Sequence, residues 1–268
     1  MIKPSQPYFV IDTLNFRQEI YLRNGISHFY TFQLDKPTDI MIVPDGCIDL
    51  LFEYRNNEMY AYACGPFLKC DMQHWNGPAE VFGIRFMPGN LPAGMYITMR
   101  ELIGKRALLW DLMKDKSMIE FLQKEKDFYQ RIRVFLECYT KMEKKQEPPF
   151  GKLELCQRVK DIIYRSNGLV KVQSISERTG YSERYLQKVF REYMGFSPKT
   201  FCKIVQFQKA IDVLNYGKGE NMTELAVALG YYDQAKFIRD FKTYAGITPS
   251  KYIKMMHERN FAGRISTE

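Results

Sequence analysis

The sequence is poor in the residues that bind metals and carry out catalysis. Its 268 residues include three histidines, and the six cysteines are scattered without a CxxC pair. A metal-dependent β-barrel needs several histidines and a carboxylate on adjacent strands, and no standard zinc spacing occurs here. The sequence also has no Gly-x-Ser-x-Gly turn and no phosphate-binding glycine loop. We therefore expect no metal, no cofactor and no enzymatic activity.

Long apolar runs are also absent. The longest apolar segment, residues 40–52, is interrupted by Asp45 and Asp49. It is too short to cross a membrane as a helix, and residues 1–7 lack the apolar core of a secretory signal. Cysteines in a chain of this length without an export signal are best interpreted as reduced. We expect a globular protein of the cytoplasm.

Positive charge is missing from one half of the chain and concentrated in the other. Residues 1–150 contain 19 Lys and Arg against 19 Asp and Glu, whereas residues 151–268 contain 20 against 12. All of the net charge of +8 therefore lies in the second part. A basic surface attracts polyphosphates through counterion release, although it also serves solubility alone.

The predicted secondary structure changes along the chain, from strands to helices. Short β-branched and aromatic segments at 8–11, 26–34, 39–43, 48–54, 59–63 and 81–86 predict strands of a barrel or sandwich. After Pro92 we expect short helices at 98–103 and 107–113, and at 117–142 either one helix or two with a break near Asp127. The apolar stripe of residues 117–142 either packs on the strands or forms a homodimer face.

The second part reads as seven helices. They are predicted at 153–166, 172–179, 183–193, 198–216, 222–229, 234–244 and 249–257. The fold class is therefore α+β, with a β-rich barrel-like front domain, trailing helices and an all-α C-terminal domain. We expect the domains at 1–143 and 153–258, a linker at 144–152 because of its prolines and charge, and a tail at 259–268.

One pattern occurs twice in the helical part, about fifty residues apart. Gly180-Tyr181 and Gly195 return as Gly230-Tyr231 and Gly246, and Ser197-Pro198 returns as Thr248-Pro249. A short helix, a glycine-containing turn and a second amphipathic helix form a helix-turn-helix. We call residues 172–193 the first reader and residues 222–244 the second reader. Two such units in tandem predict double-stranded DNA as the partner, covered over roughly 20 base pairs.

The polar stripe of each second helix supplies the candidate base contacts. Arg and Lys pair with guanine, Gln with adenine, and small apolar side chains contact the thymine methyl group. The predicted base-reading residues are Arg184, Gln187 and Lys188 in the first reader and Gln234, Ala235, Ile238 and Arg239 in the second. The predicted phosphate contacts are Ser182, Arg191, Lys199, Lys236 and Lys242. If Ile238 is buried instead, the second reader mainly anchors.

Residues 153–256 resemble the DNA-binding domain of the AraC/XylS family of bacterial transcription regulators. The resemblance rests on the segments 175–182, 185–190, 195–198, 225–231, 237–242 and 246–249. It implies seven helices, two helix-turn-helix units and promoter binding. Ser176 and Gln206 depart from the residues common in that family, and neither lies on a reading stripe.

The front half is similar to the family only in its order of strands and then helices. The resemblance implies a cupin-like sensing or dimerising domain, hence a small-molecule effector, a homodimer, or both. If an acidic effector binds inside, Arg85 is a candidate counter-charge; otherwise it is a strand residue that points outward. The alternative function is a ligand-binding or enzymatic cupin-like barrel with a helical accessory domain.

Overall fold

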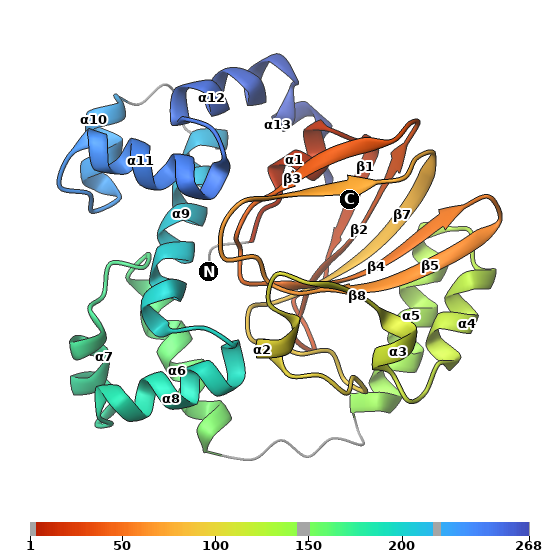
Figure 1. Ribbon diagram of the computed structural model, residues 1–268, viewed down its shortest axis with the longest axis horizontal. Coiled ribbons are helices and arrows are strands. Elements are labelled where there is room, and N and C mark those ends of the chain that lie inside the picture. Colours follow the sequence, from red (N-terminus) through yellow and green to blue (C-terminus); the bar gives the residue numbers. More distant parts are fainter. Residues whose placement is uncertain (1–3, 144–150, 217–220, 268) are drawn as a thin grey trace.

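The computed structural model describes residues 4–143, 151–216 and 221–267. The front half contains a seven-stranded sheet in the order β8-β5-β4-β7-β2-β1-β9 and a separate two-stranded ribbon, β3-β6 (Figure 1). The strands are β1 Leu14–Ile20, β2 Ile26–Leu34, β3 Thr38–Ile42, β4 Ile48–Arg55, β5 Glu58–Cys64, β6 Asp71–Trp75, β7 Ala79–Phe86, β8 Arg106–Leu108 and β9 Ser266–Thr267. The sheet is open, with β8 and β9 at its edges, rather than closed into a barrel.

Thirteen helices are found in the described residues. Those of the front half are α1 Pro7–Ile11, α2 Met99–Leu102, α3 Leu109–Leu112, α4 Ser117–Lys124 and α5 Phe128–Glu143. Those of the second part are α6 Lys152–Arg165, α7 Val172–Thr179, α8 Glu183–Met194, α9 Pro198–Tyr216, α10 Met222–Ala228, α11 Gln234–Ala245, α12 Pro249–Glu258 and α13 Phe261–Arg264. The fold class predicted from the sequence is confirmed, including the seven helices α6 to α12.

Strands β1 and β6 lie where no strand was predicted, and two further segments have another structure than predicted. Residues 8–11 form helix α1 instead of a strand, because Pro7 opens a helical turn and all five residues from Pro7 to Ile11 are buried. Residues 107–113 are not one helix, since β8 extends the sheet beside β5 before α3 begins. The break near Asp127 is found, and it separates α4 from α5.

Side chains alternate between the two faces of the seven-stranded sheet. One face, including Phe29, Phe52 and Phe82, is covered by α4 and α5, and Phe135 of α5 meets Phe29 with ring centroids 5.8 Å apart. The apolar stripe of residues 117–142 thus packs mainly on the sheet. Phe121 nevertheless remains 48% exposed.

The opposite face of the sheet shares a core with the second reader. Phe32 and Trp75 of the front half belong to one cluster of buried side chains that also contains Phe237, Phe241 and Tyr252. We call this cluster the shared core. The first reader has a core of its own, built from α6 to α9. The two readers are therefore attached to the front half in different ways.

The expected linker and tail are described only in part, and the tail contains regular structure. Residues 144–150 of the expected linker lie outside the described residues, and α6 begins at Lys152. Residues 259–267 of the expected tail include α13 and β9, and β9 pairs in parallel with β1. Arg264 donates a hydrogen bond of 3.1 Å to the carbonyl oxygen of Thr13. This segment therefore connects the second part of the chain to the front sheet.

Candidate nucleic-acid interface

The first reader consists of α7, a glycine turn and α8. Gly180 ends α7 in the left-handed conformation with φ 76°, which glycine adopts without steric cost. Ser182 then caps α8, because its side chain accepts a hydrogen bond of 3.3 Å from the backbone N–H of Tyr185. Leu186, Val189 and Phe190 are buried on the inner side of α8. The local sequence thus fixes which side of α8 faces outward.

The outward side of α8 carries the predicted polar stripe. Arg184, Lys188 and Arg191 are exposed, and Gln187 is half-buried beside them. Tyr181 and Tyr185, both exposed, stack with ring centroids 5.3 Å apart at the start of this stripe. Sequence reasoning missed this pair, although Tyr181 stood in the repeated Gly-Tyr motif. An exposed aromatic pair beside a helix N-terminus suits contact with the sugar-phosphate backbone.

The second reader repeats this geometry with α10 and α11. Asn221 caps α10, and Asp233 caps α11 by accepting a hydrogen bond of 2.6 Å from the backbone N–H of Lys236. Phe237 and Phe241 are buried on the inner side of α11. The cap and the apolar spacing therefore orient α11 as they orient α8.

The outward side of α11 is less polar, as the sequence indicates. Ala235, Arg239 and the predicted phosphate contacts Lys236 and Lys242 are exposed. Gln234 is half-buried, and its side chain accepts a hydrogen bond of 3.1 Å from Thr223 Oγ1. Ile238 is also half-buried and packs against the shared core, so only part of it faces outward.

Asp240 occupies the place that buried Val189 holds in the first reader. The structure explains this acidic residue, since its carboxylate lies between Lys236 on α11 and Lys203 on α9, at 2.5 Å and 3.8 Å. The Asp240 side chain is 16% exposed. An ion pair between α11 and the connecting helix thus replaces the apolar contact.

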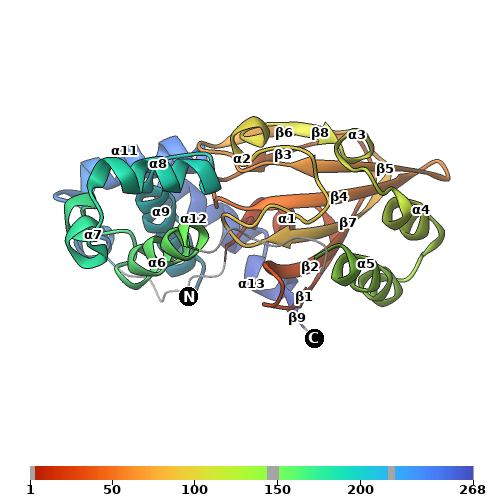
Figure 2. The same cartoon turned by 90° about the horizontal axis from the view of Figure 1, so that it is seen from below.

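The two reading helices lie on the same side of the molecule. Helix α9 runs between the readers, and α8 and α11 both lie on the side that faces the viewer in Figure 1 and the top in Figure 2. Buried residues along α9, including Phe201 and Phe207, connect the core of the first reader to the shared core. Lys199 is exposed in the first turn of α9. One face of a duplex can therefore meet both helices.

The two departures from the common family residues have structural partners. Ser176 donates a hydrogen bond of 2.6 Å to the carbonyl oxygen of Tyr181 and so ties α7 to the turn. Gln206 on α9 donates a hydrogen bond of 2.5 Å to the carbonyl oxygen of Leu229 at the end of α10. Both side chains therefore stabilise the readers through hydrogen bonds to backbone carbonyl groups.

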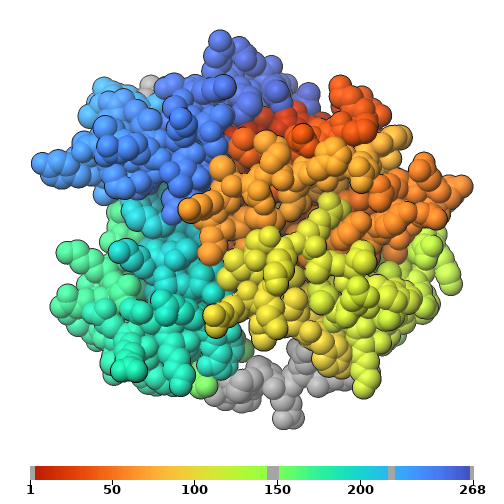
Figure 3. All heavy atoms as spheres, viewed as in Figure 1, coloured from red at the N-terminus to blue at the C-terminus, as the bar shows by residue number. Residues whose placement is uncertain are grey.

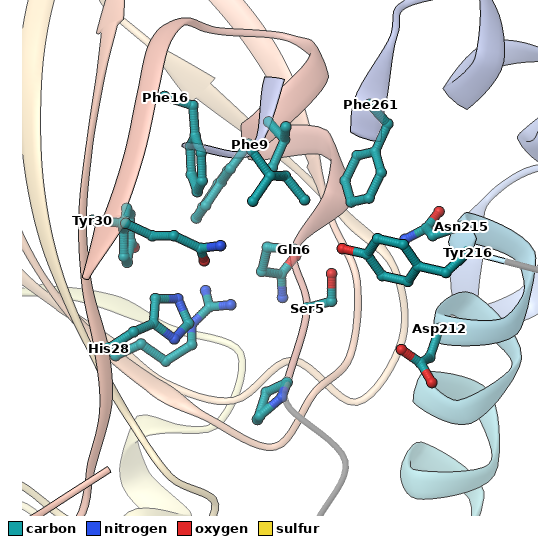
Figure 4. A pocket seen from close by; sticks show the side chains of 15 residues that line it. Ser5, Gln6, Phe9, Phe16, His28, Tyr30, Asp212, Asn215, Tyr216 and Phe261 are labelled. Atoms are coloured by element: carbon teal, nitrogen blue, oxygen red, sulfur yellow. The ribbon is translucent and has the colours of Figure 1, made fainter. Parts of the chain in front are cut away.

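A cavity of about 80 Å³ lies where the front sheet meets α9 and α13 (Figure 4). His28 and Tyr30 approach it from β2, whereas Asn215 and Tyr216 approach it from the end of α9. Asn215 accepts a hydrogen bond of 2.7 Å from Tyr252, but its buried Nδ2 has no hydrogen-bond partner among the described residues. Each side of this cavity thus belongs to a different part of the chain.

Arg85 also lines this cavity, but its charge is already compensated. It is 2% exposed, and its guanidinium pairs with Asp49 at 2.6 Å and with Asp45 at 3.1 Å. Burial raises the pKa of Asp49, and the adjacent Arg85 opposes this shift. Arg85 is therefore neither an outward strand residue nor an unpaired counter-charge for an acidic effector.

A larger cavity of about 570 Å³ lies between the front half and α6. Leu22, Met87 and Pro88 line it from the front half, and Lys160 and Tyr164 line it from α6. Lys160 is 5% exposed and donates a hydrogen bond of 2.8 Å to the carbonyl oxygen of Pro88. Burial lowers the pKa of this amine.

No group of three or more His, Cys, Asp or Glu side chains suited to a metal ion occurs within residues 4–143, 151–216 and 221–267. No helix in the same residues has the length and apolarity to cross a membrane.

Comparisons with known proteins agree with this interface. A family model described as a helix-turn-helix domain matches residues 175–255, and a domain of unknown function (DUF6597) matches residues 19–107. The probable transcription factor PqrA of Proteus vulgaris is 29% identical over 92 residues, which cover 34% of this chain and 72% of that protein. The Msm operon regulatory protein of Streptococcus mutans is 31% identical over 98 residues, or 36% of this chain and 35% of that protein.

Solved structures are similar over the same region. A probable AraC family transcriptional regulator from Rhodopseudomonas palustris has 25% identity and a TM-score of 0.35, covering 38% of this chain and 95% of that one. The chain spans most of the Proteus relative, but only about a third of the Streptococcus relative. The matched part of the chain, residues 175–255, is therefore a helix-turn-helix domain, in the region where the sequence resembles the AraC-type regulators.

Proposed function

We propose that the protein is a transcription regulator that reads two successive major-groove segments of a promoter with α8 and α11. The observation that carries this proposal is the placement of both reading helices on one side of the molecule, connected by α9 (Figures 1 and 2). A duplex presents major-groove segments to one side about 34 Å apart. The relatives are named as regulators of transcription, which supports a DNA-binding regulator rather than an enzymatic barrel.

The residue assignments remain part of this proposal. Arg184, Gln187 and Lys188 would contact bases through the first reader, and Ala235 and Arg239 through the second. Gln234 and Ile238 are further candidates, but the Gln234 side chain is hydrogen-bonded to Thr223 and Ile238 packs against the shared core. The phosphate contacts remain those predicted from the sequence, and each of these five residues is exposed: Ser182, Arg191, Lys199, Lys236 and Lys242.

The test is a selection of genomic DNA fragments by the purified full chain at about 150 mM salt, where non-specific binding is already weak. The expected result is one enriched motif of about 20 base pairs with two half-sites. The double variant Gln187→Ala/Lys188→Ala should lose preference in one half-site, whereas Lys114→Ala, an exposed control in the front half, should retain both. A motif that the double variant reads unchanged would show that α8 does not enter the groove.

We further propose that a small-molecule effector binds where the front half meets the helical second part. Its support is the cavity of about 570 Å³ that both parts line, since small-molecule sites commonly have about 300 to 1,000 Å³. A molecule held there would contact α6 and thereby bias the position of the first reader. Native mass spectrometry of the full chain tests this: a retained molecule should be displaced in Lys160→Met but not in the exposed control Lys114→Ala.

We also propose that the protein forms a homodimer. The side chains of Trp110, Phe121 and Tyr129 are 45–48% exposed on α3 to α5, away from the readers (Figure 1). Sedimentation of the full chain tests it, and the triple exchange of these residues for serine should convert a dimer into a monomer.

A DNA-binding regulator of a bacterial type would act in the cytoplasm, where the chromosome lies.

A further inference from the structure

Both reading helices end against the front half of the chain. Gly195 and Gly246 terminate α8 and α11 in the left-handed conformation, with φ of 79° and 75°. A Cβ atom at Gly195 would lie 2.7 Å from Ile103 and 3.1 Å from the backbone nitrogen of Arg100. A Cβ atom at Gly246 would lie 2.8 Å from the sulfur of Met41. The C-terminal ends of both helices are therefore in direct contact with the front half.

The contacting segments of the front half form one continuous surface. The loop 65–70 and the segment 98–105 are joined by backbone hydrogen bonds, from Gly65 to Lys105 at 2.9 Å and from Gly104 to Pro66 at 3.0 Å. Leu68 packs against the core of the first reader. Cys70 lies 3.5 Å from the Cβ position of Gly246. The residue between Leu68 and Cys70 is thus held between the two readers.

That residue is Lys69, and two further basic side chains lie on the same surface. Lys69, Arg100 and Lys105 are all exposed, and none forms an ion pair within 4.0 Å in the described part of the chain. We call these three residues the basic strap. Two acidic side chains lie in or next to these segments, Glu101 in the segment 98–105 and Asp71 after the loop 65–70. Each accepts a backbone hydrogen bond nearby, and the Glu101 carboxylate is also bound by the Thr98 hydroxyl.

The segments that carry the basic strap lie beside the reading helices. Figure 3 shows orange and yellow atoms of the front half directly beside both the teal first reader and the blue second reader. In Figure 2, α2 lies at the same edge of the molecule as α8 and α11. A duplex that covers both reading helices therefore passes in front of the strap.

We propose that the front half makes a third contact with DNA, in which Lys69, Arg100 and Lys105 bind the phosphates between the two major-groove segments. This inference rests on the proposed function. When two readers enter successive major-groove segments on one side of a duplex, the minor groove between them faces the protein. Its two phosphate strands are then the nearest anionic groups to the strap, and basic side chains at such positions add affinity without reading sequence.

The experiment compares the full chain with the variant Lys69→Ala/Arg100→Ala/Lys105→Ala. The probes are a duplex of about 30 base pairs selected from a random pool by the unsubstituted protein, and a duplex of unrelated sequence. The dissociation constant is measured over a range of salt concentrations. We expect the slope of log K against log salt to become shallower by about 1 for each lost phosphate contact, about 3 in all. The ratio of the two affinities should not change.

A matched control removes the same charge from the far side of the front half. Lys114→Ala/Lys124→Ala/Lys126→Ala changes three exposed lysines around α4 and should leave the slope unchanged. Hydroxyl-radical footprinting gives a second measurement, since protection between the half-sites should disappear only in the strap variant. All six side chains are exposed, so thermal unfolding should be unaffected.

Two results would overturn the inference while leaving the proposed function intact. Equal slopes for the strap variant and the control, with motif selection retained, would show that the strap does not touch DNA. Tighter binding by the strap variant would show that the front half obstructs the duplex. If the unsubstituted protein selects no motif at all, the proposed function itself fails, and the inference fails with it.

Discussion

The two readers share a pattern but differ in what supports them. The first reader buries Leu186 and Phe190 against α6, α7 and α9, within a core that belongs almost entirely to the helical part. The second reader buries Phe237 and Phe241 in the shared core, together with side chains of the front sheet. Tyr8 of α1 also donates a hydrogen bond of 3.0 Å to the carbonyl oxygen of Ala245 at the end of α11.

This difference shows that two helix-turn-helix units with similar sequence patterns can be attached to the rest of the protein to different extents. The second reader shares buried side chains with the front sheet. The first reader contacts the front half at α9, at the segment 98–105 beside Gly195 and at the wall of the larger cavity. Relative movement of the readers would therefore come mainly from the first reader. The reading stripe of the first reader is also the more polar one, because its predicted base contacts are Arg184, Gln187 and Lys188.

The largest expected effect tests the separation of the two cores. Phe241→Ala and Phe190→Ala each remove a fully buried ring, so each should lower the free energy of unfolding by about 3–5 kcal/mol. In a Trp110→Phe background, fluorescence reports on Trp75 of the shared core. Its denaturant midpoint should fall in Phe241→Ala and stay nearly constant in Phe190→Ala. Equal shifts in both variants would contradict the comparison.

The next effect concerns base reading. Lys188→Ala should cost about 1–3 kcal/mol at one base pair and relax preference there. Lys242→Ala, at a predicted phosphate contact on α11, should instead weaken binding to all sequences and reduce the salt slope by about 1. Binding of a panel of singly substituted operators measures both. Loss of preference in Lys242→Ala alone would reverse the roles of the two helices.

A smaller effect compares the helix caps. Ser182→Ala and Asp233→Ala remove the capping acceptors of α8 and α11, and each should cost about 0.5–2 kcal/mol of stability in the absence of DNA. The shorter, charged contact of Asp233 should give the larger loss. Asp233→Asn preserves an acceptor and serves as the control. Chemical denaturation measures the stability of all three variants. Equal stability of Asp233→Ala and the unsubstituted protein would show that capping by Asp233 does not stabilise α11.

The smallest expected effect makes the second reader more like the first. Asp240→Val places the first reader's residue in α11 and removes the pairs with Lys203 and Lys236. Partly exposed ion pairs contribute little, and burial of the valine offsets their loss, so stability should change by less than about 1 kcal/mol. The isosteric control is Asp240→Asn. A loss of several kcal/mol in thermal unfolding would show that the ion pairs hold α11 in place.

Local patterns were sufficient for much of the fold because they depend on near neighbours. The caps Ser182 and Asp233, the terminating glycines and the apolar spacing of α8 and α11 predicted both readers close to their observed bounds. Helix α1 was mistaken for a strand, since five apolar residues without periodicity fit either structure. Strand β1 was missed although Leu14, Phe16 and Ile20 alternate with polar residues, because polar Gln18 occupies the buried position of this strand.

The sequence by itself determined the double helix-turn-helix, its polar stripes and the order of strands before helices, because spacing and caps act within a few residues. Only the tertiary structure decided that the second reader shares a core with the front sheet. It also decided that Arg85 is neutralised by Asp45 and Asp49, and that residues 65–70 lie between the readers. Periodicity shows which side of an element is buried, but the surface that buries it comes from distant parts of the chain.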